Sequence, residues 1–326
     1  MKTLIEGFSA QLQEALNIAS KAVLTKKNNI QNIIVTGLGG SGIGGTILSE
    51  LIQDECSIPV LVNKDYFLPA YVNSNTLVII SSYSGNTEET VSAMKQAIVK
   101  KAQVICITSG GKIKELADQN NFDTIIIPGG KPPRSCIGFS LVQLLKVVQF
   151  NEFVKTDLLA QVSASITLLN TENTSIKNEA LTIAKLLVDK LTVIYSLGTC
   201  EGVAVRFRQQ INENSKMLCW HHTLPEMNHN ELVGWTTKNE NLAVVTFKTS
   251  FDYDRTIKRY EICKELFSKY SSSVTDITAK GNSKLEQYFY LINIGDWISC
   301  YIADLKNIDP IEVDVITNLK NELAKI

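Results

Sequence analysis

The most constraining stretch of this sequence is a glycine-rich segment that follows a short run of β-branched residues. Ile33, Ile34 and Val35 are typical of a buried parallel strand, and that run ends at Gly37. Five further glycines and one serine follow by Gly45. Glycines let the backbone approach a ligand closely, and the amides at the start of a following helix favour an anion. The segment therefore predicts a phosphate-binding loop between a strand and a helix.

The same glycines also fit a second kind of site. Gly37, Gly39 and Gly42 have the spacing of the dinucleotide-binding fingerprint, and Asp65 lies near the position of its ribose-binding acid. A dinucleotide would be held through its pyrophosphate, mainly by backbone amides. The glycine motif alone leaves both sites open.

A second loop favours a phosphate monoester. It follows the expected strand 76–80 and precedes an expected helix at 87–101, and it carries the hydroxyls of Ser82, Ser84 and Thr87. A terminal phosphate has more oxygens than amides alone can satisfy, so hydroxyl donors suit it better than a pyrophosphate. The alternative is that these hydroxyls only cap the helix that begins near Thr87.

Length, charge and composition exclude several classes of protein. The chain has 326 residues, enough for two ordinary domains, and its net charge of −1 offers no broad basic surface for nucleic acid. It lacks a run of eighteen apolar residues and an apolar N-terminal signal, so we expect a cytoplasmic protein without a membrane partner. Seven scattered cysteines indicate reduced core thiols.

Strand and helix patterns alternate through the first half of the chain. A leading helix is expected at 4–27, followed by a doubly wound α/β domain. Its expected strands are 33–36, 58–62, 76–80, 103–107 and 123–127, and its expected helices are 43–53, 87–101, 112–118 and 136–149.

The alternation then restarts in the same order. Residues 151–190 are expected to form a helical spacer with a break at 170–177. Strand 192–196 leads into a helix from Glu201, and strand 242–247 leads into a second helix, as in the first half. We interpret this as two copies of one α/β unit, residues 1–152 and 153–326, of which only the first keeps the phosphate-binding glycines and hydroxyls.

The second copy carries an unusual polar segment at 206–235, which contains all three histidines. Glu213 lies where the helix from Glu201 should end. An acid there opposes the helix dipole, and such local violations are expected at functional sites. Cys219, His221 and His229 could be considered as zinc ligands, but their spacing matches no common zinc pattern.

Five ordered segments carry a resemblance that covers essentially the whole chain. GLGGSGIGG, SSYSGNTEET, GGKPPRSCIGFS, NENSK and PEMNHNELVGW resemble the bifunctional phosphoglucose/phosphomannose isomerase family. The resemblance implies two SIS (sugar isomerase) domains, each a parallel sheet sandwiched by helices. It also implies a homodimer with its site between domains and subunits, and an enzyme that uses neither a metal nor another cofactor.

Site residues follow from the same resemblance. Glu213 matches the base, and Arg134 matches the arginine that stabilises the enediolate. His229 matches the ring-opening histidine supplied by the neighbouring subunit, and Lys306 matches a lysine at the ring oxygen. Ser299 falls where family members carry a threonine linked to dual specificity, a departure that bears on mannose activity. The residues matched to the phosphate grip are Gly40, Ser41, Ser82, Ser84 and Thr87.

The chemistry of these residues is consistent with an aldose–ketose isomerase. Moving a proton between C2 and C1 needs a base, and the enediolate needs a cationic donor. Glu213, Arg134 and His229 could instead be ordinary helix-end, surface or core residues. Two other functions also remain open: a non-catalytic regulatory protein that binds sugar phosphates, and an SIS isomerase for another sugar phosphate. Turnover of glucose, mannose and fructose 6-phosphates would separate the leading hypothesis from both.

Overall fold

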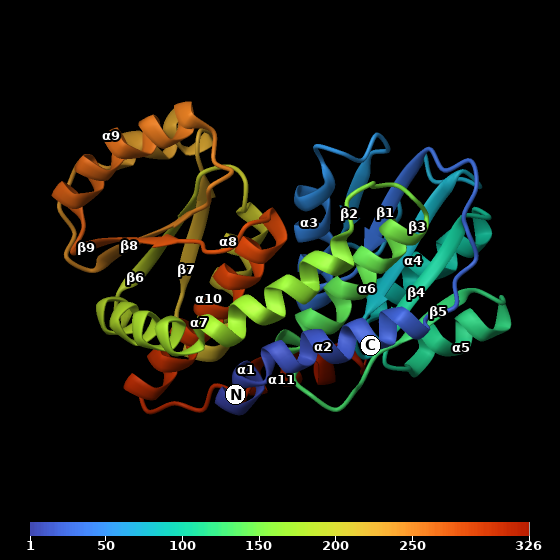
Figure 1. Ribbon diagram of the computed structural model, residues 1–326. Coiled ribbons are helices and arrows are strands. Elements are labelled where there is room, and N and C mark those ends of the chain that lie inside the picture. Colours follow the sequence, from blue (N-terminus) through green and yellow to red (C-terminus); the bar gives the residue numbers. More distant parts are fainter. Residues whose placement is uncertain (326) are drawn as a thin grey trace.

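The computed structural model describes residues 1–325 and contains one parallel β-sheet in each half of the chain (Figure 1). The first sheet has the order β2-β1-β3-β4-β5 and the second has the order β7-β6-β8-β9. The first four strands of each half are therefore arranged in the same way, which confirms the predicted duplication. The strands are β1 (Asn32–Thr36), β2 (Val60–Asn63), β3 (Thr76–Ser82), β4 (Gln103–Thr108), β5 (Asp123–Ile126), β6 (Leu191–Ser196), β7 (Cys219–Thr223), β8 (Leu242–Lys248) and β9 (Ser273–Thr278).

Helices flank both sheets, as the predicted fold class requires (Figure 1). The first half holds α1 (Lys2–Glu6), α2 (Phe8–Lys21), α3 (Gly39–Ile52), α4 (Glu88–Val99), α5 (Gly111–Gln119) and α6 (Ile137–Phe150). The second half holds α7 (Leu158–Leu187), α8 (Glu201–Ser215), α9 (Asp254–Tyr270), α10 (Lys284–Leu305) and α11 (Asp314–Leu323). Three short 3-10 helices are Pro133–Ser135, Glu226–His229 and Glu231–Gly234.

The two faces of the first sheet bury alternate residues of each strand. In β3, Leu77 and Ile79 join the core formed with α2, α3 and α6, whereas Val78 and Ile80 join the core formed with α4 and α5. Successive side chains of a strand point to opposite faces, and burying each one contributes about 1.5–3 kcal/mol. This burial on both faces explains why the strands are continuous apolar runs.

One hydrophobic core continues from the first half into the second. Ile194 of β6 and Val245 of β8 belong to the same cluster as the inner face of the first sheet. Close packing between α3 and α8 contributes to the contact, since a Cβ on Gly202 would lie 3.0 Å from the Ile47 side chain. The two halves are therefore packed directly against each other.

The structure corrects two expectations about helices. The predicted break at 170–177 is wrong, because α7 runs without interruption from Leu158 to Leu187. Leu169 and Ile176 lie two helical turns apart and are both buried, so packing keeps this polar stretch helical. The leading helix is divided at Gly7 and ends at Lys21.

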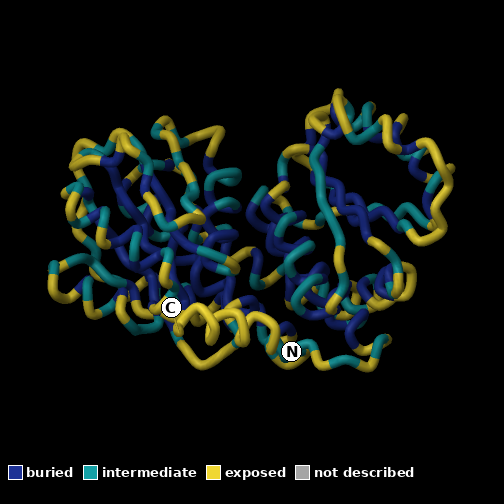
Figure 2. Tube along the Cα trace, turned by 180° about the vertical axis from the view of Figure 1, so that it is seen from behind, coloured by how far each residue is buried: buried dark blue, intermediate teal, exposed yellow. Residues whose placement is uncertain are grey.

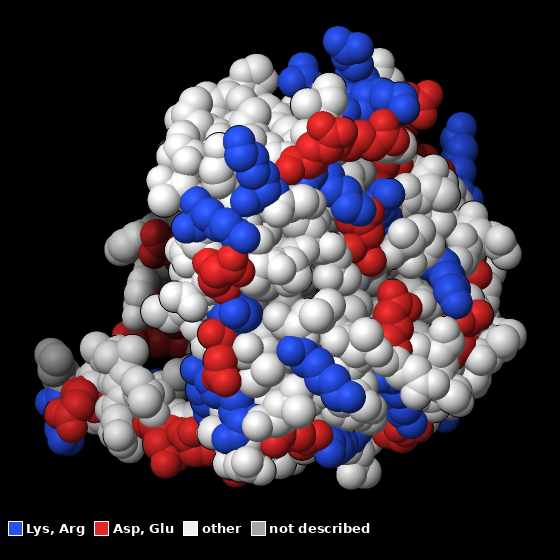
Figure 3. Space-filling view, turned by 90° about the vertical axis from the view of Figure 1, so that its left-hand side faces the viewer, with Lys and Arg blue, Asp and Glu red and all other residues white. Residues whose placement is uncertain are grey.

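The C-terminal tail, residues 306–325, returns from the second half to the first. It leaves α10, crosses beneath the gap between the halves and forms α11, a helix without a buried residue (Figure 2). In Figure 3 the tail projects at the lower left, and the Lys and Arg side chains on the face in view are interspersed with Asp and Glu. In residues 1–325, we find no helix with both the length and the hydrophobicity that a membrane crossing requires.

Candidate active site

The two loops predicted to bind phosphate lie in direct contact. Gly37 directly follows β1, and a Cβ there would lie 2.5 Å from the carbonyl oxygen of Ser81, near the end of β3. The Tyr83 amide donates a hydrogen bond to Ser41 Oγ at 3.1 Å. The glycine at position 37 is thus required by the close approach of the second loop, and Ser41 holds the two loops together.

The hydroxyl-rich loop does not use its side chains to cap α4. Thr87 occupies the N-cap position, yet its side chain makes no capping hydrogen bond. Ser82 Oγ donates to Thr87 Oγ1 at 3.4 Å, and the Asn86 amide donates to Ser84 Oγ at 3.3 Å. These contacts are long and leave lone pairs and donors for a ligand. The capping alternative therefore does not account for the Thr87 hydroxyl.

Arg134 is the residue that connects the two halves at this place. Its side chain is buried, and its guanidinium has partners on every edge. Nε donates to Asn214 Oδ1 at 2.7 Å and Nη1 donates to Glu213 Oε2 at 3.3 Å, while Nη2 donates to the carbonyl oxygens of Pro310 and Ile311 at 2.6 and 3.0 Å. The alternative of a solvated surface arginine does not fit this geometry.

Electrostatics around Arg134 keep it cationic. Burial lowers the pKa of Arg134 from its usual value, and the nearby Glu213 carboxylate opposes that shift. A guanidinium remains charged at neutral pH under such conditions. A buried, charged guanidinium therefore lies directly beside the Glu213 carboxylate.

A second buried arginine fixes the backbone of the first. Arg206 Nη2 donates to the carbonyl oxygen of Arg134 at 3.0 Å and to Asp296 Oδ2 at 2.7 Å. Gln210 Nε2 donates to Asp296 Oδ1 at 2.8 Å. Burial raises the pKa of Asp296, while the Arg206 charge opposes this shift. The network ties α8 and α10 to the segment that carries Arg134.

Glu213 lies on the last turn of α8 with its side chain 31% exposed, so its carboxylate is accessible beside Arg134. Its neighbour Asn214 is fully buried and donates from Nδ2 to Ser299 Oγ at 3.0 Å. Ser299 in turn donates to the carbonyl oxygen of Asp296. Ser299 therefore contacts Asn214, which orients Arg134.

The phosphate loops and the base meet through Arg134. A Cβ on Gly40 would lie 3.1 Å from the carbonyl oxygen of Pro133 and 3.7 Å from the Cα of Arg134. The first turn of α3, which follows β1, thus touches the backbone of Arg134, whose side chain reaches Glu213. Residues from both halves of the sequence are therefore in contact here, and their shared role in one substrate site stays a prediction.

His229 lies away from this group in its own chain. Helix α8 starts after the carboxyl end of β6 and has 15 residues. Glu213, near its end, therefore lies about 20 Å from the start of the helix, toward the amino edge of the sheet. His229 follows β7, which is parallel to β6, so it lies near the carboxyl edge, where it is exposed. Glu213 and His229 of one chain therefore lie at opposite edges of the second sheet.

Lys306 is also separate from the Arg134–Glu213 pair. It follows α10, and its Nζ lies 3.8 Å from Asp189 Oδ1, beyond the end of α7. Within residues 1–325 its contacts do not include Glu213 or Arg134. The role of Lys306 at a ring oxygen stays a prediction.

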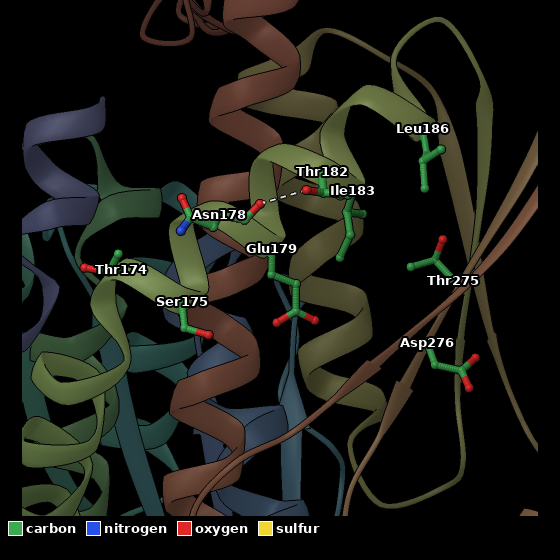
Figure 4. A pocket seen from close by; sticks show the side chains of 9 residues that line it. All are labelled: Thr174, Ser175, Asn178, Glu179, Thr182, Ile183, Leu186, Thr275 and Asp276. Atoms are coloured by element: carbon green, nitrogen blue, oxygen red, sulfur yellow. Dashed lines mark hydrogen bonds between the residues drawn. The ribbon is translucent and has the colours of Figure 1, made fainter.

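A groove of about 740 Å³ between α7 and β9 contains none of the candidate residues (Figure 4). Glu179 and Asp276 contribute carboxylates to it, and Thr182 is bonded to the backbone of Asn178 within α7. Among the described residues that line this groove, none belongs to the phosphate-binding motifs that the sequence predicts.

Comparisons with known proteins show the family to which the chain belongs. A family model described as "Bacterial phospho-glucose isomerase C-terminal SIS domain" matches residues 176–323, and one described as "SIS domain" matches residues 26–130. The bifunctional phosphoglucose/phosphomannose isomerase of Caldicellulosiruptor bescii is 42% identical, over 97% of this chain and 96% of that protein. The chain belongs to the bifunctional phosphoglucose/phosphomannose isomerase family. The family member of Aquifex aeolicus is 33% identical over 99% of this chain and 98% of its own length.

Solved structures add evidence on the fold of this family member. The C-terminal domain of glucosamine-fructose-6-phosphate aminotransferase from Francisella tularensis superposes with a TM-score of 0.75 at 13% identity. The match covers 94% of this chain and 96% of that one. At this identity the likeness shows the fold alone, namely two SIS domains of parallel sheet and flanking helices.

Sequence reasoning missed several residues of this isomerase-family site. Asn214 belongs to the polar cluster around Glu213, and only its contact with Arg134 shows its role. Pro310 and Ile311 act through backbone carbonyl oxygens, which leave no signal in a sequence. The pairing of Arg206 with Asp296 joins positions ninety residues apart.

Proposed function

We propose that this protein interconverts fructose 6-phosphate with glucose 6-phosphate and with mannose 6-phosphate, without a metal ion. The observation that carries the proposal is the contact between Arg134 and Glu213 beside the phosphate-binding loops. One end of the site offers amides and hydroxyls for a phosphate monoester. The other end offers a carboxylate and a guanidinium for proton transfer at neighbouring carbons.

The proposed reaction needs no external oxidant or reductant. Glu213 removes the proton from C2 of the open-chain aldose, and the released electron pair forms the C1–C2 double bond of a cis-enediolate. The carbonyl oxygen at C1 gains negative charge, which Arg134 stabilises. The proton of the C2 hydroxyl passes to the C1 oxygen, Glu213 returns a proton to C1, and the C2 oxygen becomes the ketone of fructose 6-phosphate.

Ring opening completes the proposal and gives His229 its role. Because His229 cannot reach Glu213 within its own chain, we assign it to the site of a second copy in a homodimer. Lys306 is the proposed donor at the ring oxygen, and Ser299 tunes discrimination at C2 through Asn214. The division into domains 1–152 and 153–326 and a cytoplasmic location are parts of the same proposal.

A coupled assay of fructose 6-phosphate formation tests the chemistry. We expect turnover of both aldose phosphates that is unchanged by a chelator. Glu213→Gln should lower kcat at least ~10²-fold, because the proposed general base is lost. Glu265→Gln, which changes an exposed acid of α9, is the matched control. Near-normal turnover in Glu213→Gln would rule out the assigned base, and binding of hexose phosphates without turnover would favour a regulatory protein.

Mixing two inactive variants tests the shared site. We expect Glu213→Gln and His229→Ala proteins to be inactive alone and to regain activity after unfolding and refolding together. A hybrid dimer would hold one site with both native groups. Absence of recovery, with hybrid dimers demonstrated by native mass spectrometry, would place His229 outside the site of the second copy.

A further inference from the structure

The C-terminal tail contacts the two ends of the site at once. Near the base, Val313, Val315 and Ile316 line a cavity of about 290 Å³ together with Glu213. Near the phosphate loop, Lys320 lines a second cavity of about 480 Å³. The tail therefore lines both the cavity beside Glu213 and the cavity beside the hydroxyl-rich loop.

The second cavity contains both hydroxyls and a cation for a phosphate only because the tail contributes Lys320. Ser84 and Thr87 contribute hydroxyls, but Glu88 and Glu89 in the first turn of α4 contribute negative charge. A phosphate dianion beside two carboxylates needs a cation to offset their repulsion. Among the described residues that line this cavity, Lys320 alone is cationic.

Lys320 is available for a ligand. Within residues 1–325 its ammonium group makes no ion pair with the acids near it, and the residue is exposed. Lys325, one turn further along the chain, is instead paired with Glu322 at 2.6 Å. The chain thus offers a paired lysine in the same tail as a control for the unpaired one.

The tail is held at the reaction end by polar contacts. Arg134 donates to the carbonyl oxygens of Pro310 and Ile311, and the Lys216 ammonium donates to the carbonyl oxygen of Glu312. Beyond this anchor, α11 has no buried residue, so little packing holds it in place. An anchored segment with a weakly held helix can close over a ligand at low energetic cost.

The geometry points to α11 as a strap over the active site, with Lys320 as a further substrate-binding residue that contacts the 6-phosphate. The inference rests on the proposed function and extends it with a specific cation for the phosphate. Closure of the strap also excludes water from the cavity beside Glu213, because its apolar residues Val313, Val315 and Ile316 face that cavity.

Titration with inorganic phosphate tests the strap without depending on catalysis. We expect phosphate to raise the melting temperature of the wild-type protein and of Lys325→Ala to the same extent. In Lys320→Ala the apparent Kd for phosphate should rise about tenfold, equivalent to about 1.4 kcal/mol, and Lys320→Arg should restore most of the affinity. Equal phosphate affinity in Lys320→Ala and Lys325→Ala would overturn the inference.

Steady-state kinetics give the second readout. We expect Lys320→Ala to raise KM for fructose 6-phosphate about tenfold and to change kcat less than twofold, because the phosphate contact exists in both ground and transition states. A fall in kcat with unchanged KM would contradict a phosphate contact. If the wild-type protein binds phosphate but lacks turnover, the proposed function fails, whereas the phosphate titration still decides the role of Lys320.

Discussion

The two copies of the fold differ in the strand-to-helix loop that corresponds to the predicted phosphate site. In the first copy, within residues 1–325, the hydroxyls of Ser84 and Thr87 after β3 contact no acidic side chain. In the second copy, Asp252 fills the corresponding loop. Its carboxylate accepts hydrogen bonds from the Thr199 hydroxyl at 2.6 Å and from the amide and hydroxyl of Thr249 at 2.6 and 2.9 Å.

The start of the following helix shows the same contrast. In the second copy, Glu50 from α3 of the first copy accepts a hydrogen bond at 2.7 Å from the amide of Gly202, near the start of α8. Helix starts attract anions through free amides and the dipole. The protein therefore occupies the second site with its own acidic side chains, Asp252 and Glu50, and leaves the corresponding site of the first copy for a ligand. The second copy gains stability from these contacts and contributes Glu213 to the proposed reaction.

Removing Asp252 should produce the largest effect on the second copy. Asp252→Ala leaves three donors without their partner, so we expect a loss of about 2–3 kcal/mol in the free energy of unfolding, measured by urea denaturation. KM for fructose 6-phosphate should stay unchanged. Asp118→Ala, which alters an exposed acid paired with Lys114, serves as the control and should change stability by less than about 0.5 kcal/mol. A large rise in KM in Asp252→Ala would show that the second copy also binds phosphate.

The opposite pattern is expected in the first copy. Ser84→Ala combined with Thr87→Val should raise KM for fructose 6-phosphate about tenfold, because two hydroxyl contacts to the phosphate are lost. The free energy of unfolding should change little, since these side chains make only long internal hydrogen bonds. The two variants together test whether one copy binds and the other stabilises. An unchanged KM in the Ser84→Ala, Thr87→Val variant would show that the first copy does not bind the phosphate through these hydroxyls.

The last effect concerns pH, and it is small for each pH unit. Burial raises the pKa of Glu50 from 4.5 to about 8, so the folded state retains a proton that the unfolded state loses. The stability that this proton contributes is complete below pH 4.5 and is lost as pH rises through about 8. We expect the wild-type protein to lose about 1 kcal/mol relative to Glu50→Gln for each pH unit between about 5 and 8, in urea unfolding. Parallel pH profiles of the two proteins would contradict this.

Local sequence patterns were sufficient for much of the fold and part of the site. The strands are runs of apolar residues such as Ile33–Val35, and the duplicated order of strands and helices repeats along the chain. The glycines after β1 and the hydroxyls after β3 lie at strand ends, and the ends of neighbouring parallel strands meet at one edge. Motifs at the carboxyl ends of neighbouring strands therefore lie close together, independently of how side chains pack elsewhere in the protein.

Tertiary structure alone decided how the second copy reaches the first. The partners of Arg134 come from α8 and from the tail, and a carbonyl oxygen such as that of Pro310 carries no residue-specific signal. The separation of His229 from Glu213 follows from the direction of α8 against its sheet. The sequence determined which groups are present and which local elements hold them, because hydrophobic periodicity and turn chemistry act over a few residues. Contacts between distant segments depend on how whole surfaces pack, so only the folded chain fixed them.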